Sequence, residues 1–179
     1  MWPTLSHREC LYLHRQSIRS MMDKFRHKFN IVFYTTDKTH FPVKTRLQHG
    51  LDLGMRMYHA MDKELKGSDK VILIGSDCPQ LDDDYLKQAF AALESPRDIV
   101  LGPANDGGYF LIGAKRVSPL LFKNISWGQA SVLKETLSAL DKLCFRPKVL
   151  DPLIDIDTIE DLKALRDLNS LPDWAKQLG

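Results

Sequence analysis

Hydrophobic residues recur along the chain in two alternating patterns. One has the three- to four-residue spacing of a helix, as with Ile18, Met22 and Phe25, and the other consists of short unbroken runs. Residues 71–74 are such a run, Val-Ile-Leu-Ile, which is typical of a strand covered by helices on both faces. Together the patterns predict helices over residues 9–29, 51–65, 82–93, 129–143 and 158–168, and strands over residues 31–35, 71–74, 99–101, 109–112 and 145–150.

Predicted strands and helices alternate along most of the chain. This order predicts an α/β fold in which a mostly parallel sheet carries helices on both faces. The length of 179 residues suits one domain, so residues 1–179 are expected to form a single domain. Residues 36–50, which include Pro42, are predicted to be a loop. Ligands bind beyond the carboxyl ends of the strands in such sheets, so functional residues are expected in the loops that follow the strands.

The composition is that of an ordinary globular protein, with 44% hydrophobic and 27% charged residues. The 25 Lys and Arg residues nearly balance the 23 Asp and Glu residues, which gives no reason to expect nucleic acid as a partner. No apolar run approaches the ~18 residues of a membrane span, and no signal-type segment opens the chain. Free cysteines without a C-x-x-C pair fit a cytoplasmic protein without a zinc knuckle, and the oligomeric state is left open.

Asp77 follows the most convincing predicted strand directly. Gly75 allows close backbone approach, and Pro79 stiffens the turn that presents the Asp77 carboxylate at the sheet edge. A carboxylate there can bind Mg²⁺ or Mn²⁺, because hard cations prefer oxygen ligands. The alternative is that Asp77 accepts hydrogen bonds within its own turn. The spacing alone does not decide between the two.

Two further segments carry acidic residues in the same kind of position. Asn-Asp-Gly-Gly at 105–108 is a strong turn signal, and it also offers Asp106 to a sugar hydroxyl and a close backbone approach at Gly107 and Gly108. Asp155 and Asp157 alternate along an extended segment, so their side chains point the same way and can meet one cation. Thr158 and Asp161 resemble a capping box, which explains that segment equally well in structural terms.

The remaining candidates are weaker. Leu53, Gly54 and Arg56 open a predicted helix, where free N–H groups can face a base or a phosphate, but a plain helix start is the simpler interpretation. Cys78 has no histidine near it in sequence and is interpreted as a buried, inert thiol. The sequence contains no G-x-S-x-G, no Walker A motif and no G-x-G-x-x-G.

Taken together, these motifs resemble the DUF2064 family of bacterial and archaeal proteins, which are of the nucleotide-diphospho-sugar transferase type. Five segments carry the resemblance in order: DLGMRM (52–57), VILIGSDCP (71–79), LGPANDGGYFLIG (101–113), ISWG (125–128) and DIDTIEDL (155–162). The resemblance implies a Rossmann-like GT-A α/β/α sandwich. It also implies glycosyl transfer from a nucleotide-activated sugar to an unidentified small-molecule acceptor, and some members are linked to arsenosugar biosynthesis.

The resemblance also implies roles for individual residues. Asp77 matches the position of the Mg²⁺- or Mn²⁺-binding aspartate of related enzymes, with Asp157, or alternatively Asp155, as a second ligand. Leu53, Gly54 and Arg56 would contact the nucleotide. Gly107 and Gly108 would face the sugar or the acceptor, and Asp106 is the candidate catalytic base.

One feature departs from the family pattern. Family members begin with a central strand and a phosphate loop ending in Lys-Thr-Arg-Leu, whereas this chain begins at what corresponds to the following helix. Lys-Thr-Arg-Leu does occur at 44–47, after the place of the second strand, and is interpreted as a coincidence. The alternatives are a rearranged segment or a chain whose true start lies upstream. A nucleotidyltransferase of the molybdopterin or phospholactate type, in the same fold, is one alternative to glycosyl transfer. The missing first strand favours another, a degenerate, non-catalytic domain.

Overall fold

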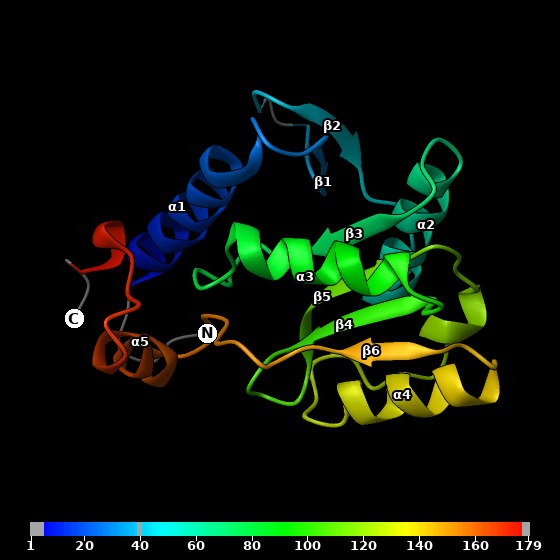
Figure 1. Ribbon diagram of the computed structural model, residues 1–179. Helices are drawn as coiled ribbons and strands as arrows, with labels where there is room; N and C mark the ends of the chain where they lie inside the picture. The colour runs from blue at the N-terminus through cyan, green and yellow to red at the C-terminus, as the bar shows by residue number, and fades with distance from the viewer. Residues whose placement is uncertain (1–5, 39–40, 177–179) are drawn as a thin grey trace.

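The computed structural model describes residues 6–38 and 41–176 and has a mixed α/β architecture (Figure 1). Its main sheet has four strands in the order β3-β5-β4-β6. The bounds of these strands are β3 Val71–Ile74, β4 Ile99–Pro103, β5 Tyr109–Ala114 and β6 Pro147–Val149. The four predicted strands in this part of the chain are thus confirmed, with small shifts at their ends.

Three of the four strands of the main sheet run in the same direction. β4 and β6 pair in parallel, and both β3 and β4 pair with β5 antiparallel. The prediction of a mostly parallel sheet therefore holds for strand direction, while β5 runs against its neighbours. Because β3, β4 and β6 run in the same direction, their carboxyl ends lie at the same edge of the sheet.

Helices cover both faces of the main sheet. On one face, α3 (Asp83–Glu94) and the end of α1 (His7–Phe25) form a core with Ile72 and Ile74 of β3. On the other face, α2 (Leu53–Leu65), α4 (Val132–Lys142) and the short helix η1 (Pro119–Phe122) pack on Val71 and Leu73. The predicted α/β/α layering is confirmed. Among the described residues, no helix has both the length and the apolar character that crossing a membrane requires.

The region predicted to be a loop, residues 36–50, contains a strand, so that prediction was wrong. β2 (Lys44–Leu47) pairs in parallel with β1 (Val32–Thr35) as a separate two-stranded sheet. Lys-Thr-Arg-Leu lacks the hydrophobic alternation of a strand, and β2 is extended because it pairs with β1. Tyr34 and Arg46 tie this pair to α2, since the Tyr34 hydroxyl donates to Glu64 at 2.6 Å and Arg46 Nε lies 2.8 Å from the same carboxylate.

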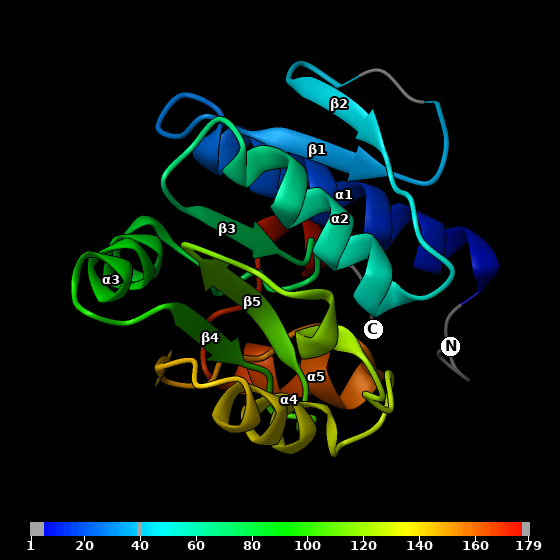
Figure 2. The ribbon, with the colours of Figure 1, turned by 90° about the vertical axis from the view of Figure 1, so that its right-hand side faces the viewer.

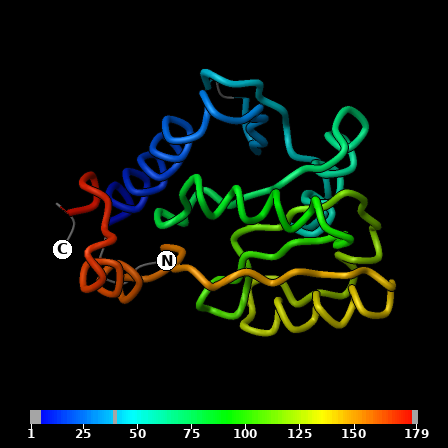
Figure 3. Tube along the Cα trace, viewed as in Figure 1, coloured from blue at the N-terminus to red at the C-terminus, as the bar shows by residue number. Residues whose placement is uncertain are grey.

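The two ends of the described chain meet in a third small core. Leu13 of α1 belongs to the same core as Leu162 and Leu165 of α5 (Ile159–Asp167), so segments far apart in sequence share it. Figure 3 shows α5 near the beginning of α1. The predicted capping box is present: the Thr158 hydroxyl accepts from Asp161 N–H, and Thr158 N–H donates to Asp161 at 2.6 Å. The short helix η2 (Asp173–Ala175) completes this core.

The centre of the main sheet should dominate the stability of the protein. Leu111 of β5 is fully buried, so Leu111→Ala should lower the free energy of unfolding by about 2–5 kcal/mol, the usual cost of such a cavity. Leu120 in η1 is 54% exposed, and Leu120→Ala should change it by no more than about 0.5 kcal/mol. Urea unfolding followed by circular dichroism measures both variants, and equal losses would contradict this location of the core.

Candidate functional site

An extended segment after β6 is held against the loops that leave β3 and β4. Leu153 N–H donates to Pro103 O at 3.1 Å, and Ile154 N–H donates to the Gln80 side chain at 2.8 Å. Ile156 N–H donates to Asp77 O at 2.9 Å. The segment is therefore anchored to both neighbouring loops at the carboxyl edge of the sheet, where ligand-binding residues are expected.

Side chains alternate along this segment. Ile154 and Ile156 are buried in the small core with α5. Asp155 and Asp157 consequently point to the other side. Burial of the two isoleucines thus fixes the direction in which the two carboxylates project.

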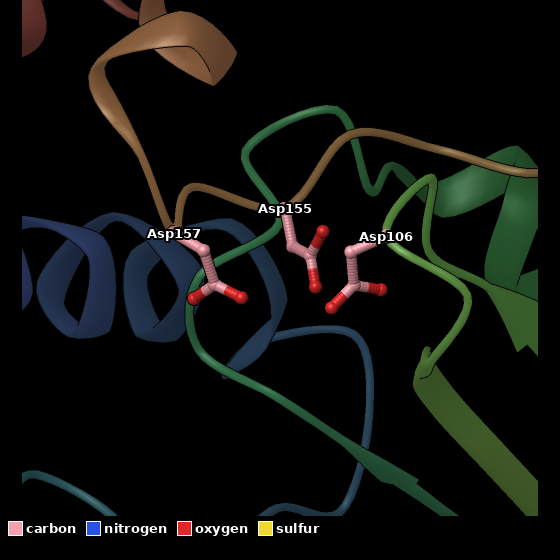
Figure 4. A group of neighbouring side chains, drawn as sticks. All are labelled: Asp106, Asp155 and Asp157. Carbon is pink, nitrogen blue, oxygen red and sulfur yellow. The ribbon is translucent and has the colours of Figure 1, made fainter. Parts of the chain in front are cut away.

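Three carboxylates converge at this edge of the sheet (Figure 4). Asp106, in the turn between β4 and β5, joins Asp155 and Asp157, and each offers an oxygen within 4.8 Å of the others. The Asp106 carboxylate is oriented locally, since it accepts from Gly108 N–H at 2.8 Å. We call Asp106, Asp155 and Asp157 the carboxylate cluster.

The loop that carries Asp77 lies beside the carboxylate cluster. Lys24 of α1 holds this loop by donating to the carbonyl oxygens of Pro79 at 3.2 Å and Leu81 at 2.6 Å. Asp77 is not a member of the cluster. The charge of Asp106 repels the Asp77 carboxylate, whereas His14 of α1 attracts it. Asp77 therefore contributes a further negative charge next to the three carboxylates.

Burial and mutual repulsion raise the pKa values of these carboxyl groups. Burial is the larger cause at Asp155, and the neighbouring charge of Asp106 adds to it, so the pKa of Asp155 rises to about 7. The pKa of Asp157 is raised by burial and then by Asp77 and Asp106. The pKa of Asp77 is raised mainly by burial. Negative charge at this edge is thus only partly compensated by the described residues.

The donor set suits a hard divalent cation. Carboxylate oxygens are the ligands that Mg²⁺ and similar cations prefer. A cation would relieve the repulsion that raises the pKa of Asp155, because a neighbouring positive charge favours the ionised form of a carboxyl group. The three residues of the carboxylate cluster can therefore hold Mg²⁺ or Mn²⁺, with Asp77 close by.

The two glycines predicted to face a substrate also have local structural roles. Gly107 has φ +92°, and a Cβ there would lie 2.2 Å from the Ala130 carbonyl oxygen, so no other residue fits without a shift. Gly108 N–H holds the Asp106 carboxylate. The backbone conformation at Gly107 and the hydrogen bond at Gly108 are enough to explain the turn sequence at 105–108. Any contact with a substrate stays a prediction.

The residues predicted to contact a nucleotide lie at the start of α2. Leu53 is 50% exposed, whereas Gly54 is buried against Trp127, where a Cβ would lie 2.7 Å from the indole carbon Cζ2. Arg56 Nε donates to the Gly50 carbonyl oxygen at 3.3 Å. Helix packing is enough to explain Gly54, and a nucleotide contact at these three residues stays a prediction.

Two residues near the site, Asp155 and His14, were not among the residues that the sequence favoured most for the site. Asp155, the alternative to Asp157, lies in the cluster together with it, and the alternation of residues 154–157 already signalled this. His14 gave no signal in sequence, because its approach to Asp77 depends on how α1 packs. Cys78 is fully buried, and burial raises the pKa of its thiol to about 12, which agrees with an inert cysteine.

Comparison with known proteins identifies the family. Residues 13–129 match the model of DUF2064, described as an uncharacterized protein conserved in bacteria, and the chain belongs to this family. A crystal structure from Desulfovibrio desulfuricans G20, described provisionally as a nucleotide-diphospho-sugar transferase, has a TM-score of 0.80 and 29% sequence identity. The similarity covers 92% of this chain and 77% of that one. No curated protein matches the chain.

The raised pKa of Asp155 predicts how stability changes with pH. In the metal-free protein the folded state keeps the Asp155 proton up to about pH 7, whereas the unfolded state loses it near the ordinary value of 3.8. Stability should therefore fall as the pH rises from 4 to 7. Asp155→Asn should make this fall smaller, because residue 155 then has no carboxyl group to ionise in a partly buried position beside Asp106.

Urea unfolding in the presence of a chelator, at pH values from 4.5 to 8, measures this dependence. The control is Asp84→Asn, because Asp84 is an exposed acid of α3 paired with Lys87 at 2.7 Å. This variant should retain the pH dependence of the wild type between pH 4.5 and 7. If the free energy of unfolding of Asp155→Asn fell with pH as much as that of the wild type, Asp155 would not be the group that titrates.

Proposed function

We propose that this protein is a metal-dependent glycosyltransferase of the GT-A type that uses a nucleotide-diphospho-sugar. The observation that carries the proposal is the carboxylate cluster, whose oxygens lie within 4.8 Å of one another at the carboxyl edge of the sheet. The likeness to the Desulfovibrio protein, at 29% identity and a TM-score of 0.80, supports the choice of substrate class. The carboxylate cluster lies at the carboxyl edge of the sheet, where ligands bind in folds of this kind.

The carboxylate cluster would hold Mg²⁺ or Mn²⁺ through Asp106, Asp155 and Asp157, with Asp77 next to it. When bound, such a cation neutralises the charge that develops on a diphosphate leaving group. Asp106 is exposed, and it lies on a turn in which its carboxylate accepts from Gly108 N–H. Asp106 would contact the acceptor, either as the catalytic base or as a ligand of the cation.

The start of α2 supplies the nucleotide side of the proposed site. Leu53 is half exposed and can cover one face of a base, while Arg56 is placed by the Gly50 carbonyl. The backbone at Gly107 and Gly108 would approach the sugar. In this arrangement the cation and the sugar are bound by loops at the sheet edge, and the base is bound by a helix start.

Binding of a nucleotide should depend on the cation and on the cluster. Isothermal titration with uridine diphosphate and guanosine diphosphate should show binding of at least one of them with Mn²⁺ and none with a chelator. Asp157→Asn and Asp77→Ala should each weaken Mn²⁺ binding roughly tenfold or more, because each removes a charge from the site. Asp84→Asn, an exposed acid elsewhere, is the matched control and should leave binding unchanged.

Binding that survives both variants undiminished would refute the cation site.

The identity of the released product tests the reaction itself. A nucleotide-sugar incubated with candidate acceptors should give a nucleoside diphosphate, detected by chromatography. Release of pyrophosphate from a nucleoside triphosphate would instead identify a nucleotidyltransferase. Absence of nucleotide binding at millimolar concentration would identify a degenerate domain without catalytic function.

A further inference from the structure

A hollow lies between the β1–β2 pair and α2. Its volume is about 480 Å³, which falls within the range of about 300–1,000 Å³ that is typical of small-molecule sites. Figure 2 shows β2 and β1 above α2, with the chain descending from the end of β2 to the start of α2. Among the described residues, the wall of the hollow comes from β1, β2, α2 and the loop between β2 and α2. The hollow is therefore separate from the carboxylate cluster.

The wall of the hollow carries basic side chains. Arg46 of β2 and Lys63 of α2 are cations. His49 and His59 add imidazole nitrogens. No aspartate or glutamate is among the described residues that line the hollow. Arg46 is paired with Glu64, whereas Lys63 has no ion pair with a described residue, so the wall carries a positive charge that favours an anionic ligand.

The guanidinium group of Arg46 is held in place in the wall of the hollow. Its Nε lies 2.8 Å from the Glu64 carboxylate, which also accepts from the Tyr34 hydroxyl at 2.6 Å. This contact uses one side of the guanidinium group, and its two terminal nitrogens have no hydrogen-bond partner among the described residues. Because Arg46 is already fixed, a ligand that accepts from these nitrogens costs little further side-chain entropy.

The ring of His59 is also oriented by the chain. Its Nδ1 lies 2.8 Å from the His49 carbonyl oxygen. Because a carbonyl oxygen only accepts, Nδ1 carries the hydrogen, and Nε2 is left for a ligand. A phosphate group suits Nε2, since a protonated phosphate oxygen donates to the neutral ring and an ionised oxygen accepts from the protonated ring. His59 and Lys63 are four residues apart on α2 and therefore lie on the same face of the helix.

The hollow has room for more than an anion. Ala60 of α2 is buried in its wall, and the small side chain of this residue keeps the space open. Leu47 of β2 supplies apolar surface from the other side, and it is 37% exposed. Apolar surface combined with a few polar groups is the usual composition of a site for an organic molecule.

We propose that this hollow binds a phosphorylated small molecule, whose phosphate group is held by Arg46, His59 and Lys63. These donors come from β2 on one side and from α2 on the other. A phosphate group has enough oxygens to accept from several directions at once, and arginine and lysine are its usual partners in proteins. The proposal does not rest on the proposed transferase activity, because binding in the hollow involves neither the carboxylate cluster nor a cation.

An NMR titration in the presence of a chelator tests the proposal. The probes are inorganic phosphate and glucose 6-phosphate, with glucose as the uncharged control and sodium chloride to keep the ionic strength constant. The ring resonances of His49 and His59 should shift with both phosphates and saturate at millimolar concentration, and glucose should leave them unchanged. The internal control is the ring of His27, an exposed histidine that does not line the hollow.

Variants of exposed residues make the test specific without disturbing the fold. Lys63→Gln should weaken binding of glucose 6-phosphate about tenfold or more, because it removes a charged hydrogen bond. His59→Asn should also weaken it, because asparagine keeps a donor for the His49 carbonyl and lacks Nε2. Lys66→Gln is the matched control, since Lys66 is an exposed lysine of the same region that pairs with Asp62 at 2.9 Å, and it should leave binding unchanged.

Saturable shifts at His49 and His59 that Lys63→Gln weakens and Lys66→Gln does not would support the proposal. Equal weakening by the two lysine variants overturns it in favour of diffuse attraction to the surface. Shifts with inorganic phosphate and none with glucose 6-phosphate overturn the organic ligand in favour of a simple anion. Unchanged histidine resonances with both phosphates, or shifts no different from those of His27, overturn the proposal altogether.

Discussion

The hydrogen bond from Ile156 N–H to Asp77 O, 2.9 Å long, is the contact on which the candidate site depends. It joins the loop after β3 to the segment after β6, two regions about 80 residues apart in a chain of 179. Asp77 and Asp106 repel both Asp155 and Asp157, and this bond helps to hold the segment in place against that repulsion. Burial of Ile154 and Ile156 supplies the opposing force, since apolar surface removed from water stabilises the segment where it lies.

The reversed strand β5 completes the same arrangement. Because β5 returns directly beside β4, the connection between them is a short turn at the carboxyl end of β4, and Asp106 lies in that turn. A helical crossover from β4 to a parallel strand would leave the carboxyl end of β4 without the short turn that carries Asp106. The one departure from parallel order in the main sheet is therefore what brings the third carboxylate to Asp155 and Asp157.

Much of this could be predicted from the sequence, and the failures have physical reasons. Val71–Ile74 is predicted without error because its apolar residues require burial on both faces. Lys44–Leu47 is missed because its extended form depends on pairing with β1, which no local pattern signals. The alternation of isoleucine and aspartate at 154–157 predicts that Asp155 and Asp157 share one side, but only tertiary packing brings Asp106 and His14 to the site.

β3 ends directly before the Asp77 loop, although it lies at the margin of the main sheet. Its carboxyl end carries the Asp77 loop, one edge pairs with β5, and the opposite edge is unpaired in the described chain. The loop nevertheless keeps its place, because Lys24 of α1 donates to two of its carbonyl oxygens and Ile156 donates to a third. The position of Asp77 is therefore determined by α1 and by the segment after β6.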